Sequence, residues 1–439
     1  MKKTHPKRTK ASKKKRKNAI LYPIYKMFSW DLLSFYSIEF LFYTITKGAT
    51  ASQALIITAV YIISKMLFQI PSVITVDYLG KRKSMIFGNV LLVVYMSLLI
   101  WAPNFTWLAI ATVFSGWGYD LKLLTEGNLL YDSVATKGGD GIYTKLESRG
   151  SSGYYILDTV LSIIAGYLFV INNYIPIYLS LFFLILSTVL SFSMKEIYHV
   201  EKKEKLSKFL KGYSTNIVDS FKFIKRSKRI RAYIIFATIF YGLIKLVGIY
   251  RSELLVELSI SAEQFSMIYA VLSLIAAISV NYTKRIQKYF RNKTLKVLSL
   301  SFILSMILCG VIAITLPVDY AIPLIIVFCT IMKIGDAQWY VTQYTYLKNF
   351  TSMRSRNKIS FIYELITGCG ASVLLLIGAS VLDYVNIKYA MVWVGLLFLA
   401  VLIVILDYMR TRFGLRPSQY SNEDIHFYAR KPKEKESVS

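Results

Sequence analysis

The sequence predicts an all-α membrane protein of twelve transmembrane helices in two six-helix bundles, with both termini in the cytoplasm. Three observations predict this class: a mean hydropathy of +0.47, twelve long apolar runs, and Lys and Arg residues gathered on one side of those runs. A helix needs about 20 residues to cross the hydrocarbon core, and runs of this length satisfy their backbone in lipid as helices. The runs lie at 27–46, 52–76, 84–103, 106–131, 150–171, 174–194, 231–250, 264–281, 295–316, 321–346, 359–382 and 388–407.

The positions of the basic residues predict the orientation. Of the 53 Lys and Arg residues, 46 fall in the terminal segments and in the even-numbered connections between runs, whereas the odd-numbered connections hold Lys47, Arg251 and Lys388. Cytoplasmic segments of membrane proteins carry the excess of Lys and Arg. This bias accounts for the net charge of +28 without a nucleic-acid partner. The N-terminal segment is expected to be a disordered arm attracted to anionic headgroups.

The longest connection divides the runs into six and six. The predicted organisation is a basic cytoplasmic arm at 1–26, an N-terminal bundle at 27–194, a cytoplasmic linker at 195–230, a C-terminal bundle at 231–409 and a cytoplasmic tail at 410–439. The segments that leave runs four and ten are similar in layout, with a Tyr followed by a short basic loop. Repeated halves are typical of secondary transporters, whose site lies at the midplane between them.

Several chemistries are not expected. The three Cys lie inside the runs, where small apolar packing is their usual role. The three His show no metal-ligand spacing, and the chain has no Gly-rich phosphate-binding loop. The sequence therefore predicts no metal, no cofactor, no nucleotide as energy source and no enzymatic activity.

Ionisable residues inside the runs form the candidate site. Such a group at the bilayer centre costs several kcal/mol and normally faces protein or water. The charges recur every third run, so runs one, four, seven and ten are predicted to surround a polar site, whereas runs three, six, nine and twelve face lipid. The proton-coupling candidates are Glu39, Asp31 and Asp120, and the substrate-cavity candidates are Lys65, Lys122, Glu126, Lys245, Lys333, Asp336 and Tyr340.

Glu39 is the preferred proton carrier. Burial disfavours the ionised form of a carboxyl group, which lets it take up and release a proton at working pH. Other assignments have alternatives. Lys122 and Glu126 lie one turn apart and fit an intrahelical ion pair equally well. Lys65 fits a pair with Glu39 or Asp158 as well as a substrate contact.

A loop motif resembles a known family. The segment FQIPSVITVDYLGKRK (68–83) resembles the signature loop of the major facilitator superfamily, G-x-x-x-D-R-x-G-R-[KR]. Val73 and Tyr78 depart from that pattern. The IPS of this segment and LLYDSV (129–134) are similar to sequences in bacterial drug-exporter-like members. The resemblance implies the major facilitator fold and a cytoplasmic gate formed by Asp77, Gly80, Lys81, Arg82 and Asp132.

In that gate, Asp77 would cap a helix N-terminus of the other half, where the helix dipole favours an anion. Lys81 or Arg82 would pair with Asp132. The resemblance also implies a secondary active transporter that moves a small-molecule substrate by alternating access, and the likeness to drug exporters favours efflux as an antiporter. The carboxylates inside the runs, with no nucleotide site, predict that the proton gradient drives transport. The composition, rich in Lys, Ile, Tyr and Phe, is typical of a multi-pass protein of the bacterial plasma membrane, and a monomer is expected. Its partners would be the substrate, protons and the lipid bilayer.

Two alternatives remain open. Proton-coupled uptake of an anionic solute is suggested by the lysines inside the runs. A non-transporting sensor or scaffold with the same fold is the other. A transporter predicts a water-accessible cavity with charges that point inward, whereas a scaffold predicts that those charges are all paired and dry.

Overall fold

The computed structural model describes residues 10–134, 139–196, 221–222, 224–225, 227–290, 293–349 and 356–413, and these contain helices but no strand. The predicted all-α membrane class is confirmed. Ten helices are long and apolar enough to span a membrane. They are α3 (Ala51–Leu79), α4 (Lys81–Trp101), α6 (Gly139–Ile171), α7 (Ile175–Ser193), α9 (Lys228–Glu257), α10 (Ala262–Val280), α12 (Thr294–Thr315), α13 (Val318–Asn349), α14 (Arg356–Tyr384) and α15 (Ile387–Phe413).

The other two predicted runs, the fourth and the first, are more polar or interrupted. The charged fourth run is the continuous helix α5 (Phe105–Val134). A short additional helix, α11 (Thr283–Phe290), lies between α10 and α12. The first predicted run, 27–46, is divided. It contains the end of α1 (Lys10–Ser29), an irregular segment at 30–38, the short helix α2 (Glu39–Leu41) and the π-helix η1 (Phe42–Thr46).

The N-terminal arm differs from the expected disordered segment. From Lys10 onward it belongs to α1, while residues 1–9 lie outside the described part. Asn18, Tyr22 and Tyr25 are at most 1% exposed, and their spacing places them on one helix face. Tertiary burial of that face, rather than the basic composition, decides the conformation. The linker at 195–230 and the tail at 410–439 lie largely outside the described residues.

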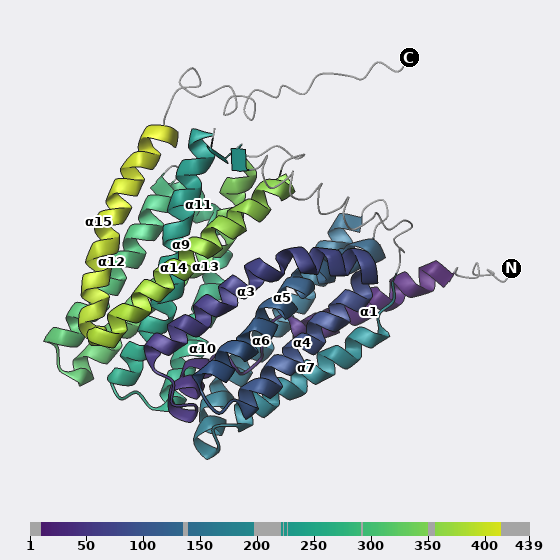
Figure 1. The fold of residues 1–439 in the computed structure, drawn as a ribbon, viewed down its shortest axis with the longest axis horizontal. Coiled ribbons are helices and arrows are strands. Elements are labelled where there is room, and N and C mark those ends of the chain that lie inside the picture. Colours follow the sequence, from purple (N-terminus) through teal and green to yellow (C-terminus); the bar gives the residue numbers. More distant parts are fainter. Residues whose placement is uncertain are drawn as a thin grey trace, which may run out of the picture. The chain divides into compact units, whose positions relative to one another are not determined.

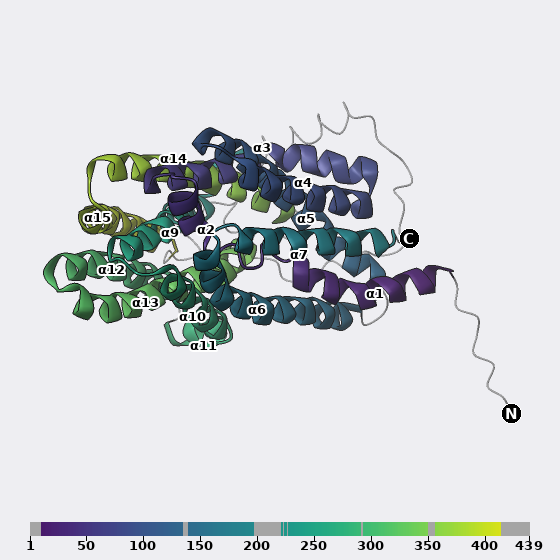
Figure 2. The same ribbon diagram turned by 90° about the horizontal axis from the view of Figure 1, so that it is seen from below.

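Contacts divide the chain into two compact units. The first consists of Met1–Lys203, Gly248–Leu274 and Leu375–Tyr384; the second consists of Glu204–Val247, Ile275–Leu374 and Val385–Ser439. In the first unit, α5 packs against both α3 and α4, and α1 packs against α6 and α7, as the ribbons show (Figures 1 and 2). In the second unit, α12 packs against α13 and α15.

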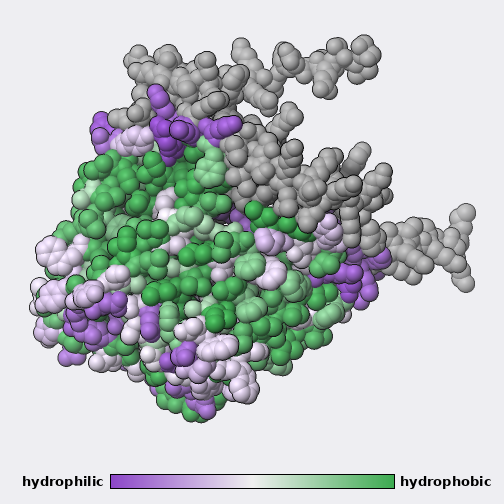
Figure 3. Space-filling model, in the orientation of Figure 1, coloured by the Kyte–Doolittle hydropathy of each residue, from purple (hydrophilic) through white to green (hydrophobic). Residues whose placement is uncertain are grey.

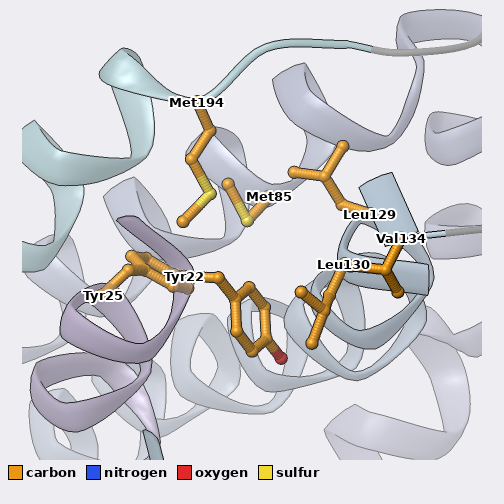
Figure 4. Close-up of a cluster of buried hydrophobic side chains, with 7 residues drawn as sticks. All are labelled: Tyr22, Tyr25, Met85, Leu129, Leu130, Val134 and Met194. Carbon is orange, nitrogen blue, oxygen red and sulfur yellow. The ribbon is translucent and has the colours of Figure 1, made fainter. Parts of the chain in front are cut away.

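One end of the first unit has a compact apolar core. Two tyrosines of α1 meet Met85 of α4, three residues of α5 and Met194, which follows α7 (Figure 4). The cluster consists of Tyr22, Tyr25, Met85, Leu129, Leu130, Val134 and Met194. Met fills irregular gaps well because its side chain is flexible. The cluster therefore fixes α1 against the N-terminal unit just before the interruption.

The outer surfaces suit a lipid environment. Large apolar side chains such as Leu67, Ile156 and Val404 are 68–69% exposed. Figure 3 shows many hydrophobic residues on the visible surface of the helices. Exposed apolar surface on this scale is rare in soluble monomers and is what a bilayer covers.

Two glycines allow α4 and α5 to pack closely in the first unit. A Cβ on Gly88 of α4 would lie 2.9 Å from the carbonyl oxygen of Gly118 on α5, and a Cβ on Gly118 would lie 2.9 Å from the carbonyl oxygen of Gly88. Small residues at such crossings let two membrane helices approach backbone to backbone. This contact sets the depth at which the polar residues of α5 enter the unit.

The variant Gly118→Ala tests the contact. Its methyl group has no room, so α4 and α5 must separate, and we expect a loss of about 1–3 kcal/mol of stability. The measurement is the apparent melting temperature of the purified protein in detergent. Gly248→Ala is the matched control, because nothing lies within 4 Å of a Cβ at that helical position. Equal melting temperatures for the two variants would contradict the packing argument.

Candidate functional site

The candidate site starts where the first helix is interrupted. Non-helical backbone at membrane depth is tolerated only where it is buried in protein or lines a water-filled space. Here α1 ends at Ser29 and the backbone reverses into the left-handed region at Ser34, with φ of 63°. The Ser34 hydroxyl donates to the Pro176 carbonyl at 3.0 Å, and the Ser180 hydroxyl donates to the Leu33 carbonyl. Helix α7 therefore holds the irregular segment in place through hydrogen bonds.

Asp31 lies in this interruption within a group of tyrosines. Its Oδ1 accepts from the Leu32 amide at 3.0 Å and from the Tyr119 hydroxyl. The Tyr119 hydroxyl also lies 3.3 Å from that of Tyr36, and the Tyr61 ring meets the Tyr119 ring edge-on at 6.2 Å. Helices α3 and α5 thus bring aromatic residues to a carboxyl group on the irregular segment.

A buried charge network, defined as Tyr25, Lys26, Lys122, Glu126 and Glu147, lies directly before the interruption. Glu126 is 5% exposed and lies 2.8 Å from Lys26 Nζ and 3.7 Å from Lys122 Nζ. The Lys26 contact is to Oε2 of Glu126, and Oε1 accepts from the Tyr25 hydroxyl at 2.6 Å. Lys26 also lies 3.6 Å from Glu147.

Lys122 has a second contact that ties the network to the interruption. Its ammonium donates to the carbonyl oxygen of Ser29, the last residue of α1, and lies 5.5 Å from the centre of the Tyr119 ring. Carbonyl oxygens at a helix C-terminus carry partial negative charge and favour cations. The i,i+4 pair of Lys122 and Glu126 is present, but Lys122 also compensates the free end of α1.

The preferred proton carrier, Glu39, lies at the other end of the interruption. It is the first residue of α2, and its Oε1 accepts from the Tyr43 hydroxyl at 3.1 Å. The Tyr43 hydroxyl is also hydrogen-bonded to the hydroxyl of Tyr95 on α4, at an oxygen–oxygen distance of 3.2 Å. Asp120, the third candidate, is 5% exposed on α5. Asp31 lies near the start of the irregular segment and Glu39 directly follows its end. Lys65 of α3 lies 5.9 Å from the Tyr61 ring centre.

The substrate candidates of the second unit lie on two helices. Lys245 of α9 lies 5.5 Å from the centre of the Tyr241 ring. Lys333 and Asp336 of α13 are 3.7 Å apart, and the Asp336 side chain is 41% exposed. Tyr340, on the same helix, is 67% exposed. The roles of these residues remain predictions.

The residues of the signature loop are tied to neighbouring helices within the first unit. Lys81 forms an ion pair with Asp132, the pairing that the resemblance implies. The Arg82 guanidinium donates to the Phe192 carbonyl at 2.7 Å. Gly80 ends α3 with φ of 82°, which glycine adopts without strain. Asp77 is exposed, and its capping of a helix in the other half remains a prediction.

Several polar residues escaped the sequence reading. Glu196 accepts from the Arg82 amide at 2.7 Å and so caps the start of α4. Asn18 exchanges two hydrogen bonds with the backbone of Lys195 and donates to Ser133. Tyr25 and Lys26 were also missed, because the arm that contains them was expected to be disordered. The available signal was the spacing of Asn18, Tyr22, Tyr25 and Ser29, which marks one helix face.

Glu147 makes a further contact at the margin of the network. The Tyr22 hydroxyl donates to Glu147 at 2.6 Å. Burial, followed by the nearby Glu147 charge, raises the pKa of the Tyr143 hydroxyl. Tyr143 therefore stays neutral at physiological pH and packs against the apolar cluster of Tyr22 and its neighbours.

The long apolar helices and the polar interruption define the class of a multi-pass membrane protein with polar groups in its interior. The chain belongs to the Major Facilitator Superfamily, whose sequence profile matches residues 26–363. No curated protein sequence matches the chain.

Solved structures agree with this fold. The nucleoside transporter NupG superposes with a TM-score of 0.69 at 11% identity, over 92% of this chain and 99% of that one. The POT family transporter PepTSo gives a TM-score of 0.66 at 11% identity, over 94% and 100%. A POT family transporter in complex with 5-aminolevulinic acid gives 0.61 at 14% identity, over 90% and 95%. The narrower resemblance to drug exporters remains a prediction.

The variant Glu126→Gln tests the buried charge network. It leaves two buried ammonium groups without their shared carboxylate, so we expect a loss of about 3–5 kcal/mol in stability. The double variant Lys26→Met with Glu126→Gln removes one of those charges and should be less destabilised than the two single losses combined. Thermal unfolding in detergent measures both. Asp319→Asn, at an exposed acidic residue, is the control; additive losses would show that Lys26 and Glu126 are not coupled.

The Lys81–Asp132 pair can be tested by charge exchange. The two side chains are 32% and 17% exposed, so Lys81→Ala should cost at most about 1 kcal/mol in stability. If the pair is a gate, Lys81→Asp should nevertheless reduce solute transport strongly, and adding Asp132→Lys should restore it. Uptake of a transported solute into proteoliposomes is the measurement. Wild-type transport by both single reversals would show that the pair is only a static surface contact.

Proposed function

We propose that this protein moves a small solute across the bacterial plasma membrane by alternating access, as a monomer and by proton-coupled efflux. The observation that carries the proposal is the interrupted first helix, which exposes carboxyl groups inside a transporter fold. Interrupted helices at the midplane are where transporters hold their substrates and coupling ions. Asp31 and Glu39 lie at the two ends of this interruption.

The division of charges favours transport over a scaffold. A scaffold would have its interior charges paired and dry, as Glu126 is between Lys26 and Lys122. Asp31 differs: it is partly exposed, and among the described residues no Lys or Arg nitrogen lies within the 4.0 Å ion-pair distance. An accessible carboxyl group without a basic partner is suited to exchange a proton or to meet a ligand.

Proton-coupled uptake of an anionic solute is the second candidate. The lysines inside the membrane helices favour it, because Lys65 and Lys245 both lie beside tyrosine rings rather than at a helix end. The direction of the proton flux distinguishes efflux by antiport from uptake by symport. When solute is added on one side of the membrane, an antiporter moves protons toward that side, whereas a symporter moves protons away from that side together with the solute.

Glu39→Gln tests the proton carrier. Gln keeps the hydrogen bond from Tyr43 but cannot ionise, so solute-dependent proton movement should fall to background while solute–solute exchange persists. The measurement is an internal pH dye in proteoliposomes, with labelled solute followed in parallel. Asp319→Asn serves as the control. If Glu39→Gln keeps proton coupling, the proton carrier is Asp31 or Asp120 instead. If Glu39→Gln, Asp31→Asn and Asp120→Asn each keep proton coupling, coupling through these residues is refuted.

A further inference from the structure

The interruption of the first helix presents a selective set of side chains. Between residues 30 and 39, Leu32, Leu33, Ser34, Phe35, Ser37 and Ile38 are buried, whereas Trp30, Asp31, Tyr36 and Glu39 are partly exposed. The apolar residues hold the segment in place, and the accessible ones are aromatic or acidic. Tyr61 and Tyr119, which approach from α3 and α5, are partly exposed as well.

The two acidic groups nearest the end of α1 differ in how their charge is compensated. Glu126 has two ammonium groups, at 2.8 and 3.7 Å. Asp31 accepts from the Leu32 amide and the Tyr119 hydroxyl, with Tyr36 close by, and the Lys122 charge acts on it only from beyond the 4.0 Å ion-pair distance. A positively charged group is therefore the component that this carboxyl group still accommodates.

The end of α1 already binds one ammonium group. Lys122 Nζ donates to the Ser29 carbonyl, lies 3.7 Å from Glu126 and sits 5.5 Å from the Tyr119 ring centre. A tethered ammonium thus uses a helix C-terminus, a carboxylate and an aromatic ring at once. Asp31 and Tyr36 repeat two of these three elements around the Tyr119 hydroxyl, and in the described part of the chain no ammonium group forms an ion pair with Asp31.

Aromatic rings in this region also take cations. Lys26 Nζ lies 4.5 Å from the Trp30 ring centre, which shows that the ring beside Asp31 accepts an ammonium over its face. Such contacts contribute about 0.5–2 kcal/mol each. A ligand with both a positive charge and a flat or apolar body would use the carboxyl group and the rings together.

From these contacts we infer that residues 30–39, with Tyr61 and Tyr119, recognise the ammonium group of an organic cation, and that Asp31 provides its counter-charge. The inference rests on the proposed function, since the cation would be the transported solute. It narrows the substrate to an amine with an aromatic or apolar body. An anionic solute is the opposing outcome, because Lys65 approaches the same ring cluster through Tyr61.

The test is equilibrium binding to the full-length protein in lipid nanodiscs, without any gradient. Three radiolabelled probes share one ring: phenethylammonium, the neutral phenethyl alcohol and the anion hydrocinnamate. We expect saturable binding of phenethylammonium only. Asp31→Asn should weaken it by at least about ten-fold, the scale of one charge-assisted hydrogen bond. Asp31→Glu should keep the preference for the cation, and Tyr119→Phe should weaken binding less than Asp31→Asn.

Controls separate this inference from folding and from transport. Asp319→Asn should bind as the wild type does, and the melting temperature of each variant identifies misfolding. Tighter binding of hydrocinnamate, no saturable binding of phenethylammonium, or unchanged binding by a folded Asp31→Asn protein would each overturn the inference. If the cation binds through Asp31 but is not transported, the inference holds and the proposed function is refuted. If a solute is transported equally well with and without the Asp31 carboxylate, the inference is refuted and the proposed function holds.

Discussion

Backbone groups freed inside a membrane need hydrogen-bond partners, and this requirement governs the N-terminal unit. The carbonyl oxygens at the end of α1 and in the irregular segment find Lys122 from α5 and Ser180 from α7. Ser34 holds a left-handed conformation because its hydroxyl is bonded to the Pro176 carbonyl. Without these donors each free group would cost several kcal/mol in lipid, and a continuous helix would replace the interruption.

The same donors create the electrostatics of the site. Lys122 reaches both the α1 terminus and Glu126, so its charge is shared between a helix dipole and a carboxylate. Lys26 completes the compensation of Glu126. Among the described residues, neither lysine lies within the 4.0 Å ion-pair distance of Asp31, although the Lys122 charge acts on Asp31 from farther away. The pattern places a closed, neutralised network beside an accessible carboxyl group, which is the arrangement expected where a solute or proton enters and leaves.

The end of the first unit that holds the signature loop links this site to the segment that follows α7. The side-chain amide of Asn18 on α1 bonds both the carbonyl and the amide N–H of Lys195. Glu196, the next residue, caps the start of α4 at the signature loop. The first helix, the loop and the exit of α7 are therefore held at one point. A displacement of any of them strains the others, so the loop and the interrupted helix are mechanically connected through a few hydrogen bonds.

The sequence by itself determined the membrane class, the all-α fold and the approximate positions of the spans. Hydropathy over about 20 residues and the lysine distribution are local, additive properties that need no partner. It also marked Asp31, Glu39, Lys122 and Glu126, because a charge in an apolar run stands out whatever it contacts. Only the tertiary structure decided that the first span is interrupted and that Lys26 lies in a buried network. Those outcomes depend on donors from α5 and α7, which lie far away along the chain and which no local pattern near residue 30 records.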